Sequence, residues 1–234
     1  MVRKAGDLIA AFHEHLREQQ LAARRAKPIG AGTYGVVYES DTPGNVMKQI
    51  KQDYVNPKTG LGILNEANLQ AVAGEMGIAP KVAGVETFSG GIGNRIEMAD
   101  VRQNYSPVKG EGDAFGMPGV GMPVDPTINI RTAQQLGQLA LKGVRLEDRR
   151  AANIMRHNMT GRPLQLDYGI AGKVEGSEQV AALTMATSDG FEAAGLGDVA
   201  DIYRATVMDL LEGGDVQEAM DVAKQGFSRL QKIK

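Results

Sequence analysis

The sequence predicts an α+β protein in which a small strand-rich part precedes a mainly helical part. Residues 28–50 combine Gly and β-branched residues with an internal turn signal, which is typical of antiparallel strands. A Gly/Pro-rich segment at 103–127 has no sustained period, and apolar residues at helical spacing follow it. We therefore expect a small antiparallel β lobe containing one helix and a reduced, mainly helical lobe.

The strand-rich part is preceded by residues 1–27, where an amphipathic helix is expected at 7–25. This helix packs on the protein's own body or, alternatively, binds a partner or a membrane surface. The lobe itself spans 28–100. Strands are expected on both sides of the "TPGN" turn and later in "KVAGVETF" and "RIEM", with a helix at 61–76 between them.

The second part begins with an inter-lobe loop at 101–128, and the helical lobe covers 129–234. Its apolar periods predict helices at 129–143, 198–212 and 215–232. Between the first two helices, the short apolar pieces "NIM" and "LQL" flank the turn-like "NMTGRP". This pattern predicts a short hairpin.

Composition excludes several classes of protein. The chain has 234 residues, a formal net charge of −2, three histidines and no cysteine. It offers no disulfide, cysteine-ligated zinc or thiol nucleophile, and we expect no histidine metal site and no nucleic-acid partner. No apolar run reaches the roughly 18–20 residues of a membrane helix, and charges interrupt the N-terminal stretch. We expect a cytoplasmic protein without a membrane span, acting in its own cell or, as an effector or viral product, in a host.

The stretch "GAGTYG" carries the first sign of chemistry. Gly30 and Gly35 permit backbone conformations that a β-carbon forbids, and Gly32 removes bulk where phosphates would approach. Dinucleotide-binding proteins share this spacing, but there it joins a strand to a helix. Because "VVYES" and a turn follow here, a strand–loop–strand arrangement is the better interpretation.

Lys48 lies in the apolar strand "VMKQI", where an unpaired charge would be costly to bury. Glu66, in the expected helix at 61–76, can supply the anionic partner. A lysine held in this way presents its ammonium group to phosphate oxygens. The alternative is a surface lysine beside a surface helix.

Asp148, Asn153 and Asp167 lie at the ends of the two apolar pieces of the expected hairpin. The hairpin would bring Asn153 near Asp167. Three acceptor-rich side chains gathered in this way suit a magnesium–phosphate site. The alternative is that the two aspartates cap turns.

Taken in order, "IGAGTYGVVYES", Lys48, Glu66, "EDRRAANIM" and "LQLDYGIA" resemble the signature set of the eukaryotic-like protein kinases. The resemblance runs from about residue 29 to residue 171. It implies a two-lobed protein-kinase-like fold in a compact form whose reduced C-lobe is similar to that of bacterial effector-type kinases.

The resemblance also implies roles for individual residues. Asp148 would orient the attacking hydroxyl and accept its proton, Glu66 would lock Lys48, and Arg150 would steady the γ-phosphate. Asn153 and Asp167 would hold Mg²⁺. The residues that would bind ATP are Ile29, Gly30, Gly32, Gly35, Val37, Lys48, Glu97 and Ala99, the last two through their backbone.

The chain departs from the family in three places. Leu146 and Glu147 stand where the family has His-Arg, and that arginine usually pairs with a phosphorylated activation loop. Tyr168 replaces a phenylalanine, and no Ala-Pro-Glu follows Asp167. "DRRAAN" is close to the spelling of some tyrosine kinases, but it does not assign the acceptor.

Three functions follow as hypotheses. The first is an ATP- and Mg²⁺-dependent protein kinase that phosphorylates Ser/Thr or Tyr hydroxyls of a protein substrate, or of itself. The second is a small-molecule kinase of the aminoglycoside or choline type. The stretch "GIAPKVAGV" resembles those families. The third is a nucleotide-binding pseudokinase that acts as a scaffold for a protein partner.

Overall fold

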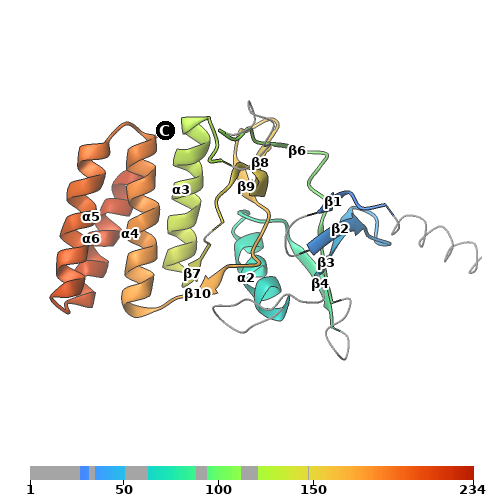
Figure 1. The fold of residues 1–234 in the computed structure, drawn as a ribbon, viewed down its shortest axis with the longest axis horizontal. Coiled ribbons are helices and arrows are strands. Elements are labelled where there is room, and N and C mark those ends of the chain that lie inside the picture. Colours follow the sequence, from blue (N-terminus) through green and yellow to red (C-terminus); the bar gives the residue numbers. More distant parts are fainter. Residues whose placement is uncertain (1–26, 32–34, 51–62, 88–93, 112–120, 147) are drawn as a thin grey trace, which may run out of the picture. The chain divides into compact units, whose positions relative to one another are not determined.

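The computed structural model describes residues 27–31, 35–50, 63–87, 94–111, 121–146 and 148–234 (Figure 1). The chain is α+β, and its internal packing divides it into two compact units. Residues 1–55 and 82–100 form the first unit, and residues 56–81 and 101–234 form the second. The amphipathic helix expected at 7–25 lies outside the described residues.

The first unit is built on a five-stranded antiparallel sheet with the strand order β1-β2-β3-β5-β4. The Gly-rich stretch joins β1 to β2 as two antiparallel strands, which confirms the strand–loop–strand interpretation. The "TPGN" turn joins β2 to β3, with Gly44 at a φ of 83°. The strands are β1 (Gly30–Ala31), β2 (Gly35–Glu39), β3 (Asn45–Ile50), β4 (Val82–Glu86) and β5 (Arg95–Ala99).

The second unit contains the five described α-helices, of which α3–α6 stand side by side (Figure 1). The helices expected at 61–76, 129–143, 198–212 and 215–232 are confirmed. They are α2 (Ile63–Glu75), α3 (Pro126–Leu141), α5 (Gly197–Glu212) and α6 (Val216–Leu230). The helix that contributes Glu66 therefore belongs by its packing to the second unit.

Helix α4 (Gly176–Ala193) was not predicted from the sequence. It packs against α3, α5 and α6. Because it contacts helices on several sides, its sequence does not show a single apolar stripe with a polar face opposite. It also buries the polar side chains of Thr184, Thr187 and Ser188. These residues interrupt the apolar period that identifies an ordinary amphipathic helix.

Short strands complete the second unit. The expected hairpin is confirmed: β8 (Ile154–His157) pairs with β9 (Pro163–Gln165), and β6 (Tyr105–Pro107) adds a third antiparallel strand. Strand β7 (Val144–Arg145) pairs with β10 (Gly172–Lys173). The segment expected to lack regular structure contains β6 and also a bridge between Gly110 and Pro123.

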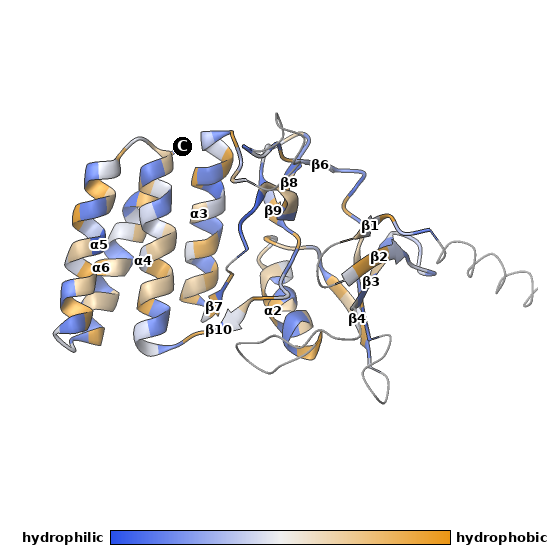
Figure 2. Cartoon of the chain, viewed as in Figure 1, coloured by the Kyte–Doolittle hydropathy of each residue, from blue (hydrophilic) through white to orange (hydrophobic). Residues whose placement is uncertain are grey.

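The helices of the second unit approach one another closely at glycines. A β-carbon on Gly137 of α3 would lie 2.1 Å from the Phe227 ring of α6, and one on Gly190 would lie 2.6 Å from Leu230. Figure 2 shows hydrophobic residues distributed along α3–α6, where they form the buried cluster that includes Leu183, Phe227 and Leu230. Within the described residues, no helix is long and apolar enough to cross a bilayer.

Replacing Gly137 with alanine is expected to destabilise the protein. Alanine favours a helix over glycine, but its methyl group would overlap the buried Phe227 ring, and overpacking of a core costs about 1–3 kcal/mol. Urea unfolding of the variant measures the change in free energy. Gly197→Ala is the matched control, because a β-carbon there meets no atom within 4 Å. Equal stability of Gly137→Ala and the wild type would contradict this packing.

Candidate functional site

Four of the residues predicted to bind nucleotide come together on the sheet of the first unit. Gly30 is the register partner of Val37, and Val37 is the partner of Lys48, so the three form one cross-strand row. Residues directly opposite in a ladder share a face of the sheet. A β-carbon on Gly35 would lie 3.0 Å from Cε of Lys48. The absence of a side chain at Gly35 therefore leaves room for the lysine side chain.

One further residue of the predicted ATP site, Ile29, is described by the structure and lies just before the Gly-rich stretch. The backbone N–H of Ile29 donates to the carbonyl of Val37 at 2.9 Å, which extends the β1–β2 pairing by one residue. Gly32 lies outside the described residues. The close approach of Gly35 to Lys48 is thus the feature of this stretch that constrains the site.

Glu97 and Ala99 of β5 differ in their strand pairing. Glu97 is paired with Met47 on one side and Gly84 on the other, so its backbone faces neighbouring strands. This position argues against a backbone contact from Glu97 to a ligand. Ala99 is the last residue of β5 and is paired on the β3 side alone. Its role stays a prediction.

The side chain of Glu97 has a different set of partners. It accepts hydrogen bonds from the hydroxyl of Ser40 and from the amide of Asn45, both near the β2–β3 turn. The hydrogen bond from Ser40 is the largest cause of a lowered pKa for Glu97, and Thr42 and Asn45 act in the same direction. Glu97 therefore contributes to the turn that follows β2.

Lys48 and Glu66 are both buried, at 7% and 3% relative exposure. Charged side chains are seldom buried unless they are paired, so both positions suit the roles expected of them. Lys48 belongs to the first unit and Glu66 to the second. The ion pair between them stays a prediction.

The loop between β7 and β8 carries Asp148 and Arg150, which form a bidentate ion pair. The guanidinium donates from Nε to Oδ1 at 2.8 Å and from Nη2 to Oδ2 at 2.5 Å. Burial acts to raise the pKa of Asp148, but the hydrogen bonds and charge of Arg150, helped by Asn153, lower it below its ordinary value. Arg150 was predicted to steady a γ-phosphate, and in this structure it holds the carboxylate of Asp148.

The β8–β9 hairpin brings Asn153 beside the segment that leads to Asp167. Ile154 is paired with Gln165, and the N–H of Leu166 donates to the carbonyl of Asn153 at 2.8 Å. Asp167 accepts the N–H of Gly169 on Oδ1 at 3.0 Å. The backbone of Asn153 thus lies beside Leu166, the residue before Asp167, and a metal site shared by the side chains of Asn153 and Asp167 stays a prediction.

The amide nitrogen of Asn153 is buried and, within the described residues, lacks a hydrogen bond of full geometry. The amide nitrogen lies near enough to Asp148 to lower the pKa of its carboxyl group, but it does not point at the carboxylate with hydrogen-bond geometry. Among the described residues there is no cluster of three or more His, Asp or Glu side chains placed to hold a metal ion. Mg²⁺ sites commonly combine one or two carboxylates with substrate phosphates, and the pair Asn153 and Asp167 fits such a shared site.

Arg149 is a residue whose role was not predicted. Its guanidinium forms an ion pair with Asp189 of α4, so the loop that carries Asp148 is fastened to that helix. Burial lowers the pKa of Arg149, and the charge of Glu192 opposes this effect. Two successive arginines stand in the sequence, and nothing local distinguishes the one that turns toward α4.

Arg149 also borders a cavity of about 430 Å³ formed by α3, α4 and the residues on either side of 112–120. Three carboxylates line this cavity, namely Glu111, Asp189 and Glu192. Thr132 lines it as well, and its buried hydroxyl has no hydrogen-bond partner within the described residues. The cavity is therefore polar and carries more negative than positive groups.

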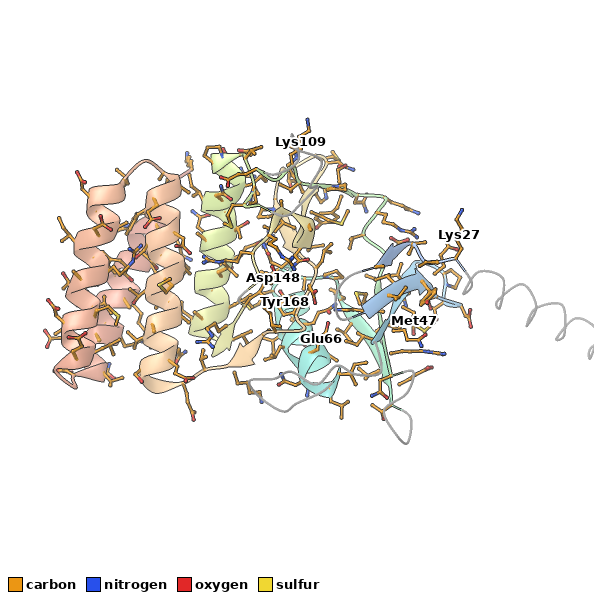
Figure 3. All side chains as sticks on the ribbon, in the orientation of Figure 1. Lys27, Met47, Glu66, Lys109, Asp148 and Tyr168 are labelled. Carbon is orange, nitrogen blue, oxygen red and sulfur yellow. The ribbon has the colours of Figure 1, made fainter. Side chains whose placement is uncertain are left out.

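Tyr168, which follows Asp167, is completely buried between α2 and α3 (Figure 3). It packs with Leu69 of α2 and with Leu136 and Leu139 of α3 in one hydrophobic cluster. Its hydroxyl has no hydrogen-bond partner in the described part of the chain, and burial raises the pKa of the phenol. The ring is held by apolar packing, and the hydroxyl adds an unpaired polar group.

Neither a scan against models of protein families nor a search of the curated proteins finds a match to this chain.

Replacing Tyr168 with phenylalanine is expected to raise the free energy of unfolding by about 1 kcal/mol, because a buried unpaired hydroxyl costs about 1–3 kcal/mol. Tyr203→Phe is the matched control. The hydroxyl of Tyr203 donates to the carbonyl of Ala223 at 3.2 Å, so the same substitution there is expected to lower stability. Urea unfolding of the two variants measures both signs. Loss of stability in Tyr168→Phe would show that its hydroxyl is paired.

The lowered pKa of Asp148 predicts a pH dependence of stability. An aspartate in the unfolded chain has a pKa of about 3.9, and the folded value is lower. The stabilisation by Asp148 is therefore complete above that pH and is lost as the pH falls through the folded pKa. The difference in unfolding free energy between the wild type and Asp148→Asn should be constant near neutrality and shrink in acid. A difference that stays constant down to pH 2 would contradict the Arg150 pairing.

Proposed function

We propose that this chain is an ATP- and Mg²⁺-dependent phosphotransferase with a two-lobed protein-kinase-like fold, and that it phosphorylates hydroxyls of proteins, itself included. The observation that carries the proposal is the β8–β9 hairpin, whose pairing brings Asn153 beside Asp167 in the same unit as Asp148. A catalytic aspartate together with two metal-binding side chains in this order is what a kinase site requires.

The sheet of the first unit supports the proposal from the nucleotide side. Lys48 lies on β3, the strand on which a kinase lysine is expected, and Gly35 of the Gly-rich hairpin packs against its side chain. Lys48 would bind the α- and β-phosphates, with Glu66 as its expected partner. Gly30, Gly35 and Val37 would cover the nucleotide from the same face.

Asp148 supports the proposal from the acceptor side. A carboxyl group with a lowered pKa is ionised at neutral pH, so it can accept a hydrogen bond from the hydroxyl and hold that oxygen toward the phosphate. It is a weak base in this state. Catalysis by such a group is mainly positioning and charge stabilisation, as in phosphoryl transfer generally.

Asn153 and Asp167 would hold Mg²⁺, which supplies charge neutralisation at the phosphates. The amide nitrogen of Asn153 acts on Asp148 and cannot bind a metal, so Mg²⁺ would be held by the amide oxygen of Asn153 and the carboxylate of Asp167.

In this proposal Arg150 can pair either with Asp148 or with the γ-phosphate. Its guanidinium now occupies both oxygens of Asp148, which the acceptor hydroxyl also needs. We therefore expect Arg150 to leave Asp148 when a nucleotide binds and to turn to the γ-phosphate. The ion pair would then hold the loop in place only while the phosphates are absent.

A small-molecule kinase is the second candidate function, and the cavity beside Arg149 favours it. Glu111, Asp189 and Glu192 line this cavity, and so does Arg149, the residue that follows Asp148. Carboxylates in such a cavity suit an acceptor that carries amino groups. The experiment below separates the two acceptor classes.

Incubating the full chain with γ-labelled ATP and Mg²⁺, first alone and then with a cell lysate, tests the proposal. Transfer of label to protein is expected. In Asp167→Ala the rate should fall at least about 100-fold, since an interaction with the transferring group is removed. Asp209→Ala, at an exposed aspartate of α5, is the matched control and should retain transfer.

Unchanged transfer by Asp167→Ala would exclude the proposed metal site. Label found on small molecules instead of protein would establish the second candidate. Nucleotide binding without any transfer would support the pseudokinase hypothesis and overturn both enzymatic ones. Circular dichroism of Asp167→Ala is needed beside these assays, because loss of fold would also abolish transfer.

A further inference from the structure

A second polar cavity, of about 390 Å³, lies between α3 and the turn of the β8–β9 hairpin. Within the described residues no carboxylate lines it. Its walls are formed by two arginines, three glutamines, one threonine and one proline, and these are Arg131, Gln134, Gln135, Gln138, Thr160, Arg162 and Pro163. A cavity whose only charged groups are two guanidinium ions attracts anions.

The two guanidinium groups make few contacts with the protein. Arg131 donates from Nη1 to the carbonyl of Thr160 at 2.9 Å, and Arg162 donates from Nη2 to the carbonyl of Met76 at 3.4 Å. In the part of the chain that the structure describes, neither arginine forms an ion pair with a carboxylate. Each guanidinium has five N–H donors, so most of their donor capacity remains for a ligand.

The backbone holds these arginines at the cavity. Gly161 has a φ of 64°, which glycine adopts readily, and the position of its absent β-carbon is 3.3 Å from Nη1 of Arg131. A β-carbon there would be strained at this φ and would require the guanidinium of Arg131 to shift by a few tenths of an ångström. The glutamines offer fewer hydrogen bonds to a ligand, because the amide nitrogens of Gln134 and Gln135 already donate to backbone carbonyls.

We infer that this cavity binds a phosphate group through Arg131 and Arg162. Two guanidinium ions balance the charge of a phosphate dianion, whereas a carboxylate would neutralise only one of them. Arginine also matches the geometry of phosphate oxygens with pairs of parallel hydrogen bonds. The site is separate from the proposed nucleotide site and does not depend on phosphoryl transfer.

The position of the cavity gives phosphate binding a structural consequence. Arg131 belongs to α3, whereas Arg162 lies in the turn between β8 and β9. A phosphate held by both would fasten the hairpin to α3. The hairpin is the element that keeps Asn153 beside Asp167, so the bound anion would stabilise that arrangement.

Both arginines also have a plain structural role, and the experiment must separate it from binding. Arg162 donates to the carbonyl of Met76 near the C-terminal end of α2, and Arg131 donates to the hairpin turn. Loss of these contacts lowers the melting temperature in any buffer. Phosphate binding is measured instead by the increase in melting temperature that phosphate causes within each variant.

Titration of the full chain with inorganic phosphate at constant ionic strength, followed by thermal unfolding and calorimetry, tests the inference. The wild type is expected to gain melting temperature as phosphate increases. In Arg131→Gln and in Arg162→Gln the dissociation constant for phosphate should rise at least about 10-fold, as expected for the loss of a charge-assisted hydrogen bond. Arg156→Gln removes the same charge from β8 outside the cavity and should leave the constant unchanged.

Lys48→Met distinguishes this site from the proposed nucleotide site, because phosphate binding in the cavity should survive that substitution. Phosphoserine in place of inorganic phosphate distinguishes the source: tighter binding of phosphoserine indicates a phosphorylated side chain, and tighter binding of inorganic phosphate indicates the free ion. Equal dissociation constants for the wild type, Arg131→Gln and Arg162→Gln would overturn the inference. So would a wild type that phosphate does not stabilise.

Discussion

The pairing of β8 with β9 is the constraint on which the candidate site depends. Ile154 and Leu164 are buried on opposite faces of this short hairpin, and the N–H of Gln165 donates to the carbonyl of Ile78 at 2.7 Å. A two-stranded ribbon alone is marginal in water, so these attachments to the rest of the unit decide whether it persists. All three residues of β9 are buried, so a shift of register would disturb packing on both faces of the hairpin, and the core therefore holds Asn153 beside Leu166.

The two arginines that follow Asp148 form ion pairs with different carboxylates. Arg149 is drawn to Asp189 of α4, and Arg150 turns back to Asp148 itself. The first ion pair is partly buried on both sides, with side chains 27% and 25% exposed, whereas Arg150 is 48% exposed. The more exposed contact is the easier one to exchange, since solvent screens it more strongly. The loop thus combines a fixed attachment with an exchangeable one.

Local signals explain which elements could be predicted from the sequence. The β2–β3 turn and the β8–β9 hairpin have turn residues between apolar runs, and both are found where the sequence indicated. Helix α4 has no such signal, because it packs on three helices and buries Thr184, whose hydroxyl donates to its own helix at Val180. The ion pair of Arg149 with Asp189 of α4 and the position of Glu97 between two strands depend on tertiary contacts. No pattern of neighbouring residues reveals them.

The segment after β6 closes on itself before it reaches α3. Glu111 donates to the carbonyl of Met122, Val124 donates to Lys109, and Gly121 comes so close to Glu111 that a β-carbon there would lie 2.8 Å away. Residues 111 and 121 are therefore held side by side, and loop-closure entropy grows only slowly with length, by about 0.6 kcal/mol per doubling. An affinity tag or a reporter domain inserted between 112 and 120 would thus be carried at little cost in folding free energy.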